Sequence, residues 1–159
     1  MVGLLAALVL CIVNFDILRS SGSFDKPAWS IYRRFLFAVL MYYITDILWG
    51  ILEYKKLSAA LFIDTTVYFM ATAVGISFWA DYTAAFLNGS KAFGRVLTLI
   101  GRIIVGLIMA MTVINIFHPV LFIVDSSCVY KTLPMRHVVL VCQILFLIII
   151  SVYALNCRI

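Results

Sequence analysis

The run VLTLIGRIIVGLIMAMTVINIF, from Val96 to Phe117, decides the fold of this chain. It holds a single charged residue, Arg102, and it exceeds the roughly 20 apolar residues that a helix needs to cross a bilayer. His118 and Pro119 follow it, and proline does not readily continue a helix. The run therefore predicts a membrane-spanning helix that ends at Phe117.

Four further apolar runs of similar length flank this one. The five predicted helices cover residues 1–18, 31–53, 59–82, 96–117 and 137–156. Strands of a membrane barrel would instead alternate apolar and polar residues over roughly ten positions. The sequence therefore predicts an all-α fold: a polytopic membrane helix bundle with about five transmembrane helices, forming one transmembrane domain over residues 1–159.

The composition of the whole chain points the same way. Of its 159 residues, 65% are hydrophobic and 12% are charged, whereas soluble domains average roughly 45–50% and 25%. A soluble domain of this length has no room to bury such an excess, so we expect the lipid bilayer to cover it. Five spanning helices also leave almost no residues for a soluble catalytic domain.

Basic residues between the predicted helices indicate the orientation. If the first helix enters from outside, the inner side holds seven basic residues, namely Arg19, Lys26, Arg33, Arg34, Lys91, Arg95 and Arg158. The outer loops hold four, namely Lys55, Lys56, Lys131 and Arg136. Basic residues mark the cytoplasmic side. We therefore expect the N-terminus outside and the C-terminus inside a bacterial cytoplasmic membrane, and we attribute the net charge of +5 to these loops and not to nucleic-acid binding.

Of the acidic residues within the predicted spanning helices, Asp46 and Asp64 carry the functional argument. An aspartate at the centre of such a helix costs about 2.5–3.5 kcal/mol on insertion scales. Asp46 shares one helical face with Trp49, and Asp64 shares a related face of the next helix with Tyr68. Each of these faces should therefore point at protein or water. The alternative is a structural role, in which the carboxylates accept interhelical hydrogen bonds or pair with Arg136 or Lys55.

The polar residues converge on the outer half of the predicted bundle. Asn115 and His118 close the fourth helix, and the loop over 120–136 carries Asp125 and Arg136. We expect an outward-facing cavity, closed by this loop, that binds a small ligand or an ion. Its candidate ligand-binding residues are Asp46, Trp49, Asp64, Tyr68, Asn115, His118, Asp125 and Arg136. For Asn115 and His118 at the end of the fourth helix, the alternative is that His118 and Pro119 form an ordinary helix end.

No catalytic or metal-binding pattern accompanies these residues. The sequence contains no HExxH, GxSxG or Walker-type phosphate loop. The four cysteines form no CxxC pair, and most lie in apolar runs, so they indicate packing and not a disulfide framework or a zinc site. We therefore expect no enzyme activity and no cofactor within this chain.

The pattern of polar residues resembles the N-terminal membrane region of Clostridia-type signalling proteins. The matching positions are Tyr32–Phe35, Tyr43–Leu52, Asp64, Tyr68–Phe69, Phe117–Asp125, Tyr130, Arg136, Gln143–Phe146 and Tyr153. In that family, a multi-helix membrane sensor precedes a cytoplasmic output domain, often a GGDEF diguanylate cyclase and sometimes a histidine kinase. The resemblance implies that this chain is the sensor portion of a longer receptor, and that it acts as a homodimer.

Two functional hypotheses from different classes follow. The leading one is a sensory module that binds a small ligand in its outer half and passes a change in helix packing to a cytoplasmic output. The alternative is a small transporter or channel subunit in which Asp46 and Asp64 line a path for ions or protons. A purely structural assembly subunit would contain neither a ligand site nor a path.

Overall fold

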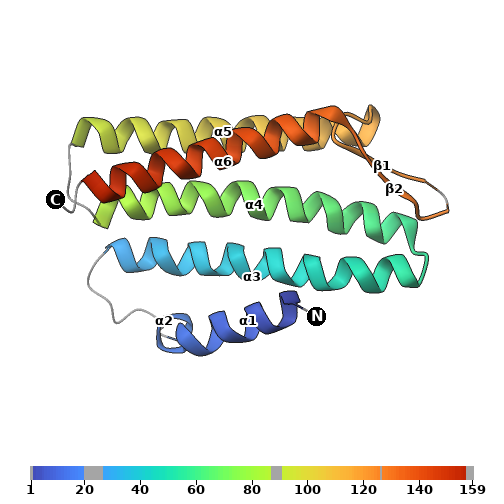
Figure 1. The fold of residues 1–159 in the computed structure, drawn as a ribbon, viewed down its shortest axis with the longest axis horizontal. Helices are drawn as coiled ribbons and strands as arrows, with labels where there is room; N and C mark the ends of the chain where they lie inside the picture. The colour runs from blue at the N-terminus through green and yellow to red at the C-terminus, as the bar shows by residue number, and fades with distance from the viewer. Residues whose placement is uncertain (1, 20–26, 87–90, 126, 157–159) are drawn as a thin grey trace.

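The computed structural model describes residues 2–19, 27–86, 91–125 and 127–156. Its elements, in chain order, are α1 (Val2–Val13), α2 (Phe15–Arg19), α3 (Pro27–Tyr54), α4 (Ser58–Phe86), α5 (Lys91–Phe117), β1 (Phe122–Val124), β2 (Tyr130–Thr132) and α6 (Pro134–Asn156). The long helices α3 to α6 lie along one another, and α1 and α2 lie against α3 (Figure 1). The predicted all-α helix bundle is confirmed.

Four of the described helices are long and apolar enough to cross a membrane. They are α3, α4, α5 and α6, with spans at Ala28–Tyr54, Ser58–Phe86, Ala92–Phe117 and Pro134–Asn156. The chain is therefore a membrane protein, and the expected count of about five agrees roughly with these four helices and the shorter apolar helix α1. At 12 residues, α1 is about 18 Å long, less than the roughly 30 Å of a bilayer core.

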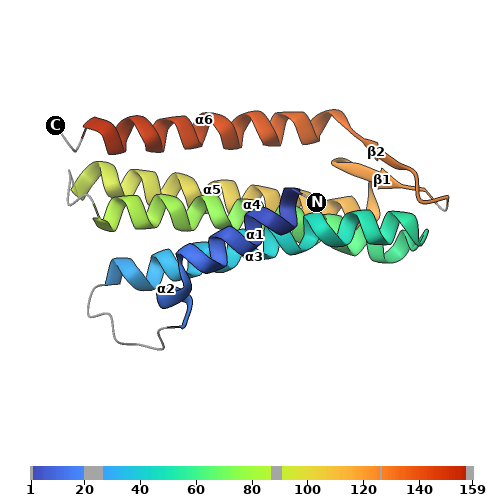
Figure 2. The same ribbon diagram turned by 60° about the horizontal axis from the view of Figure 1, so that its bottom comes forward.

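Asn14 explains why the first apolar segment is not one continuous spanning helix. α1 ends at Val13 and α2 begins at Phe15. The Asn14 side chain donates to the Leu10 carbonyl at 3.0 Å and accepts a hydrogen bond from the Tyr32 hydroxyl, also at 3.0 Å. This amide thereby ties the α1–α2 junction to the first turns of α3, and the segment lies obliquely across that helix (Figure 2).

Small residues let α4 pack closely between α3 and α5. A Cβ atom at Gly75 of α4 would lie 3.6 Å from the Ala38 Cβ atom of α3, and one at Gly101 of α5 would lie 3.3 Å from the Ser77 Oγ atom of α4. Close approach of this kind replaces the hydrophobic effect as the source of helix association in lipid. α4 accordingly carries ten buried residues along its length.

The segment after α5 forms a short antiparallel hairpin where the sequence predicted a loop. In the register of β1 and β2, Phe122 pairs with Thr132 and Val124 pairs with Tyr130. Phe122 is fully buried and stacks on Phe69 of α4 at a centroid distance of 5.7 Å. The hairpin is therefore packed onto the end of the bundle and does not extend freely from it.

Asn115 anchors this hairpin to α5. Its Oδ1 atom accepts hydrogen bonds from the backbone N–H groups of Val120 and Leu121, both at 2.7 Å, and from that of Phe122 at 3.4 Å. Its Nδ2 atom donates to the Phe122 carbonyl at 3.1 Å. One buried amide thus satisfies backbone groups that neither the helix nor the hairpin ladder can satisfy.

We expect Asn115→Ala to release the hairpin, because it leaves buried N–H groups without an acceptor at a cost of about 1–3 kcal/mol each. The reporter is Cys128 in the hairpin, which is 5% exposed. In a background with Cys11, Cys142 and Cys157 replaced by alanine, a polar maleimide should label Cys128 faster in Asn115→Ala. Ser127→Ala serves as the control within the hairpin. Equal labelling rates in all three proteins would refute the anchoring role.

Candidate functional site

A polar cavity of about 300 Å³ lies at the hairpin end of the bundle. Its walls come from four elements that are distant in sequence: α3, α4, β2 and the first turn of α6. The lining residues are Thr45, Asp46, Trp49, Asp64, Thr65, Tyr68, Phe69, Tyr130 and Arg136. Five of the eight candidate residues from the sequence, Asp46, Trp49, Asp64, Tyr68 and Arg136, therefore meet in one cavity.

Aromatic rings join the hairpin to the helices around this cavity. Tyr130 of β2 meets Trp49 of α3 edge to face at a centroid distance of 6.2 Å, and it stacks on Phe122 at 5.8 Å. On the opposite side, Tyr68 meets Tyr42 of α3 at 5.2 Å. Contacts of this geometry add about 0.5–1.5 kcal/mol each beyond their buried area. The cavity is thus framed by rings that hold α3, α4 and β2 together.

Asp64 is the most deeply buried charged group in the cavity wall. Its side chain is 7% exposed, and its Oδ2 atom is buried without any hydrogen-bond partner. The neighbouring Thr65 does not supply one, because its hydroxyl donates to the Leu61 carbonyl of its own helix at 2.8 Å. This carboxylate oxygen is therefore not held in a dry interhelical hydrogen bond.

Asp46 occupies the edge of the same cavity, where α1 crosses α3. Its side chain is exposed in the isolated chain. A Cβ atom at Gly3 of α1 would lie 2.5 Å from the Asp46 Oδ2 atom, closer than real Cβ atoms approach. A larger residue at this position would force the Asp46 carboxylate to move away from the start of α1. The sequence reasoning missed Gly3, because a glycine in an apolar run shows no sign of a distant contact.

Arg136 supplies the positive charge of the cavity without neutralising the aspartates. Its guanidinium lies over the Tyr130 ring, 5.5 Å from the ring centroid. Within the described residues, it makes no ion pair with Asp46 or Asp64. Burial raises the pKa of the Tyr130 phenol, and the nearby positive charge of Arg136 opposes that rise only in part. Tyr130 therefore stays neutral and able to donate a hydrogen bond at physiological pH.

Three candidate residues lie outside the cavity wall. Asn115 is committed to the hairpin backbone, as described above. His118 is exposed beyond the end of α5. Asp125 is exposed at the hairpin turn, where its Oδ2 atom accepts a hydrogen bond from the Ser127 hydroxyl at 3.4 Å. The structure does not bring these three residues together with the other five, because Asn115 is bonded to the hairpin backbone and His118 and Asp125 are exposed.

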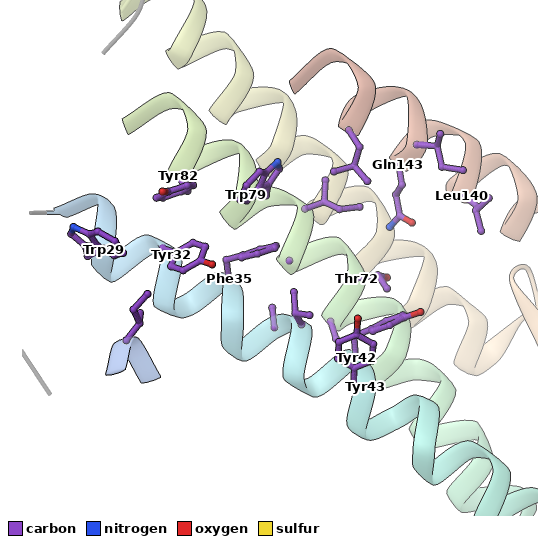
Figure 3. A pocket seen from close by; sticks show the side chains of 18 residues that line it. Trp29, Tyr32, Phe35, Tyr42, Tyr43, Thr72, Trp79, Tyr82, Leu140 and Gln143 are labelled. Atoms are coloured by element: carbon purple, nitrogen blue, oxygen red, sulfur yellow. The ribbon is translucent and has the colours of Figure 1, made fainter. Parts of the chain in front are cut away.

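A second, larger cavity of about 940 Å³ lies between α3, α4 and α6 (Figure 3). It is a mainly apolar groove lined by aromatic and aliphatic residues. They are Ile17, Trp29, Tyr32, Phe35, Ala38, Val39, Tyr42, Tyr43, Ala71, Thr72, Gly75, Ile76, Trp79, Tyr82, Leu140, Gln143, Ile144 and Leu147. We call it the aromatic groove. Tyr42 lines this groove and Tyr68 lines the polar cavity, so their ring contact forms part of the wall between the two.

Three comparisons with known proteins give no match to this chain. No protein family, no curated protein and no solved structure matches it. Among the described residues, no group of three or more histidine, cysteine or acidic side chains is arranged to hold a metal ion. The resemblance to signalling proteins therefore remains a prediction, and the site is interpreted from its own geometry.

We expect Asp64→Leu to raise the stability of the ligand-free protein by about 1–3 kcal/mol, because it removes a buried polar group that lacks a hydrogen bond. Reversible unfolding in mixed detergent micelles measures the change. Glu53→Gln, at an exposed position near the end of α3, is the control and should shift stability by less than about 0.5 kcal/mol. A destabilised Asp64→Leu protein would mean that the carboxylate is a structural hydrogen-bonding group.

Proposed function

We propose that this chain is a membrane-embedded sensory module that binds a small, positively charged ligand in the polar cavity. The observation that carries the proposal is the Asp64 Oδ2 atom, buried in the cavity wall without a partner. Burying a carboxylate costs free energy unless an opposite charge or donor compensates it. A ligand whose ammonium group binds Asp64 supplies both an opposite charge and a hydrogen-bond donor.

The charges of the lining residues favour a cation over an anion. Asp46 and Asp64 face the cavity, and Arg136 is engaged with the ring of Tyr130. Trp49 and Tyr68 add aromatic rings to the lining, and such rings attract cations through their negative faces by about 0.5–2 kcal/mol. A volume of about 300 Å³ suits a molecule the size of a simple amine or amino acid.

α6 is the element suited to relay binding through the membrane. It follows the hairpin directly, and Arg136 in its first turn lines the cavity. Its buried residues are limited to Val139, Phe146 and Ile150, so few contacts resist its displacement. A ligand shifts such an equilibrium only by its difference in affinity between two helix arrangements. Repulsion between the positive charge of the ligand and the Arg136 guanidinium in the first turn of α6 provides that difference.

The direction of signalling follows from the basic residues and the family resemblance. The excess of basic residues at the end opposite the hairpin favours a hairpin that faces the extracytoplasmic side of a bacterial membrane. The ligand then enters from outside, and α6 carries the change to a cytoplasmic GGDEF or kinase output domain. Homodimerisation belongs to the same proposal, since the resemblance implies it.

A panel of small charged molecules tests the proposal. Choline, ethanolamine, γ-aminobutyrate and acetate are added to the protein in nanodiscs, and the thermal midpoint is measured. We expect at least one ammonium compound to stabilise the wild type and to lose this effect in Asp64→Asn. Asp125→Asn, an acidic residue outside the cavity, is the matched control and should respond as the wild type does. No response in any protein, or an equal response in Asp64→Asn, would refute the proposal.

The transporter alternative is separated from the sensor by flux. Spin labels at residues 85 and 154, on α4 and α6, report helix displacement, and a pH-sensitive dye in proteoliposomes reports proton movement. The sensor predicts a ligand-dependent change of the label distance without flux. Proton flux that requires both Asp46 and Asp64 would favour the transporter.

A further inference from the structure

The aromatic groove has the size and position of a ligand site within the membrane. Its volume of about 940 Å³ lies at the upper end of the range for small-molecule sites. Three of its lining residues on α6, Leu140, Ile144 and Leu147, are also among the exposed apolar side chains of the described residues. The groove therefore opens to the bilayer along α6, and a lipophilic molecule can enter it from there.

One end of the aromatic groove is a cluster of four rings from α3 and α4. Tyr32 lies 5.0 Å from Tyr82, and Phe35 lies 5.1 Å from Trp79, between ring centroids. Trp79 and Tyr82 are 5.6 Å apart and link the two pairs. Clustered rings of this kind offer faces and edges for stacking another flat ring.

Gln143 contributes a buried hydrogen-bond donor without an acceptor to the described lining of the groove. Near the middle of α6, Gln143 extends its side chain toward α3 and α4 (Figure 3). Its Nε2 atom is buried and has no hydrogen-bond partner. Two other polar groups of the groove are already used: the Tyr32 hydroxyl donates to Asn14 at 3.0 Å, and the Thr72 hydroxyl donates to the Phe69 carbonyl at 2.9 Å.

An unsatisfied amide at this depth calls for an acceptor that lipid tails do not provide. In the hydrocarbon core, each unsatisfied polar group costs several kcal/mol. An acyl chain would fill the groove and leave the Gln143 N–H group unpaired. A molecule that satisfies both features has a flat ring for the aromatic cluster and a carbonyl oxygen for Gln143.

We propose that the aromatic groove binds a membrane quinone, with a ring carbonyl oxygen accepting a hydrogen bond from Gln143 Nε2. The quinone ring packs against the cluster of Phe35 and Trp79, and its apolar tail leaves the groove past Ile144 into lipid. Because α6 lines both this groove and the polar cavity, an occupied groove holds α6 against α3 and α4. Quinone binding in this groove does not require the ligand proposed for the polar cavity.

The three tryptophans of the chain give the test its reporters. Trp29 and Trp79 line the groove, whereas Trp49 lines the polar cavity. Decyl-ubiquinone, a quencher of tryptophan fluorescence, is titrated into nanodiscs that hold the full chain. We expect saturable quenching in Trp49→Phe, which keeps the two groove reporters, and only weak, linear quenching in Trp29→Phe/Trp79→Phe. Linear quenching in both proteins would overturn the proposal.

Two further variants test the contacts. Gln143→Leu should weaken decyl-ubiquinone binding about 5- to 10-fold, since it removes one hydrogen bond. Ile144→Phe, at a position 48% exposed, should fill the groove and abolish saturable quenching, whereas Ile148→Phe on the lipid-facing side of α6 should not. Unchanged affinity in Gln143→Leu would refute the carbonyl contact. Dibrominated phosphatidylcholine that quenches Trp29 and Trp79 and is not displaced by the quinone would identify an acyl chain as the occupant and overturn the proposal.

Discussion

Hydrocarbon offers no hydrogen-bond partner, so a polar side chain inside a membrane must find one within the protein or in a ligand. Most of the buried hydroxyl groups in this chain meet that demand locally. Thr65 donates to the carbonyl of Leu61, and Thr112 donates to that of Ile108, each one turn back along its own helix. Among the described residues, buried side-chain atoms of Asp64, Asp81 and Gln143 have no hydrogen-bond partner. Those of Asp64 and Gln143 belong to residues that line a cavity.

Residues of α6 line both cavities. α4 forms the centre through close contacts with α3 and α5, whereas α6 touches this centre at few buried positions. The polar cavity meets the first turn of α6 through Arg136, and the aromatic groove meets its middle through Gln143. A ligand in either cavity therefore acts on the same helix. The ring pair of Tyr42 and Tyr68 lies between them, so the two sites are adjacent and need no long path of coupling.

The sequence predicts those parts of the architecture that follow from the free-energy cost of placing polar or charged groups in lipid. Long apolar runs have to be spanning helices, and Asp46 and Asp64 attract attention because each would be expensive in lipid. Other features have no such signal. The three-residue strands are too short to show a pattern, and the role of Asn115 depends on a backbone seven residues away. The rings of the aromatic groove look like ordinary packing residues, because a hydrophobic side chain has the same identity whether it faces a neighbour, lipid or a cavity.

The occupancy of the polar cavity is the point on which the functional account rests. The most direct measurement is an experimental structure of the full chain in lipid, determined with and without choline. We expect density for the ammonium group beside the Asp64 carboxylate, with Arg136 still over the Tyr130 ring and α6 displaced relative to the choline-free structure. A collapsed cavity in which Asp64 Oδ2 accepts a hydrogen bond from a protein group, with or without choline, would contradict the account.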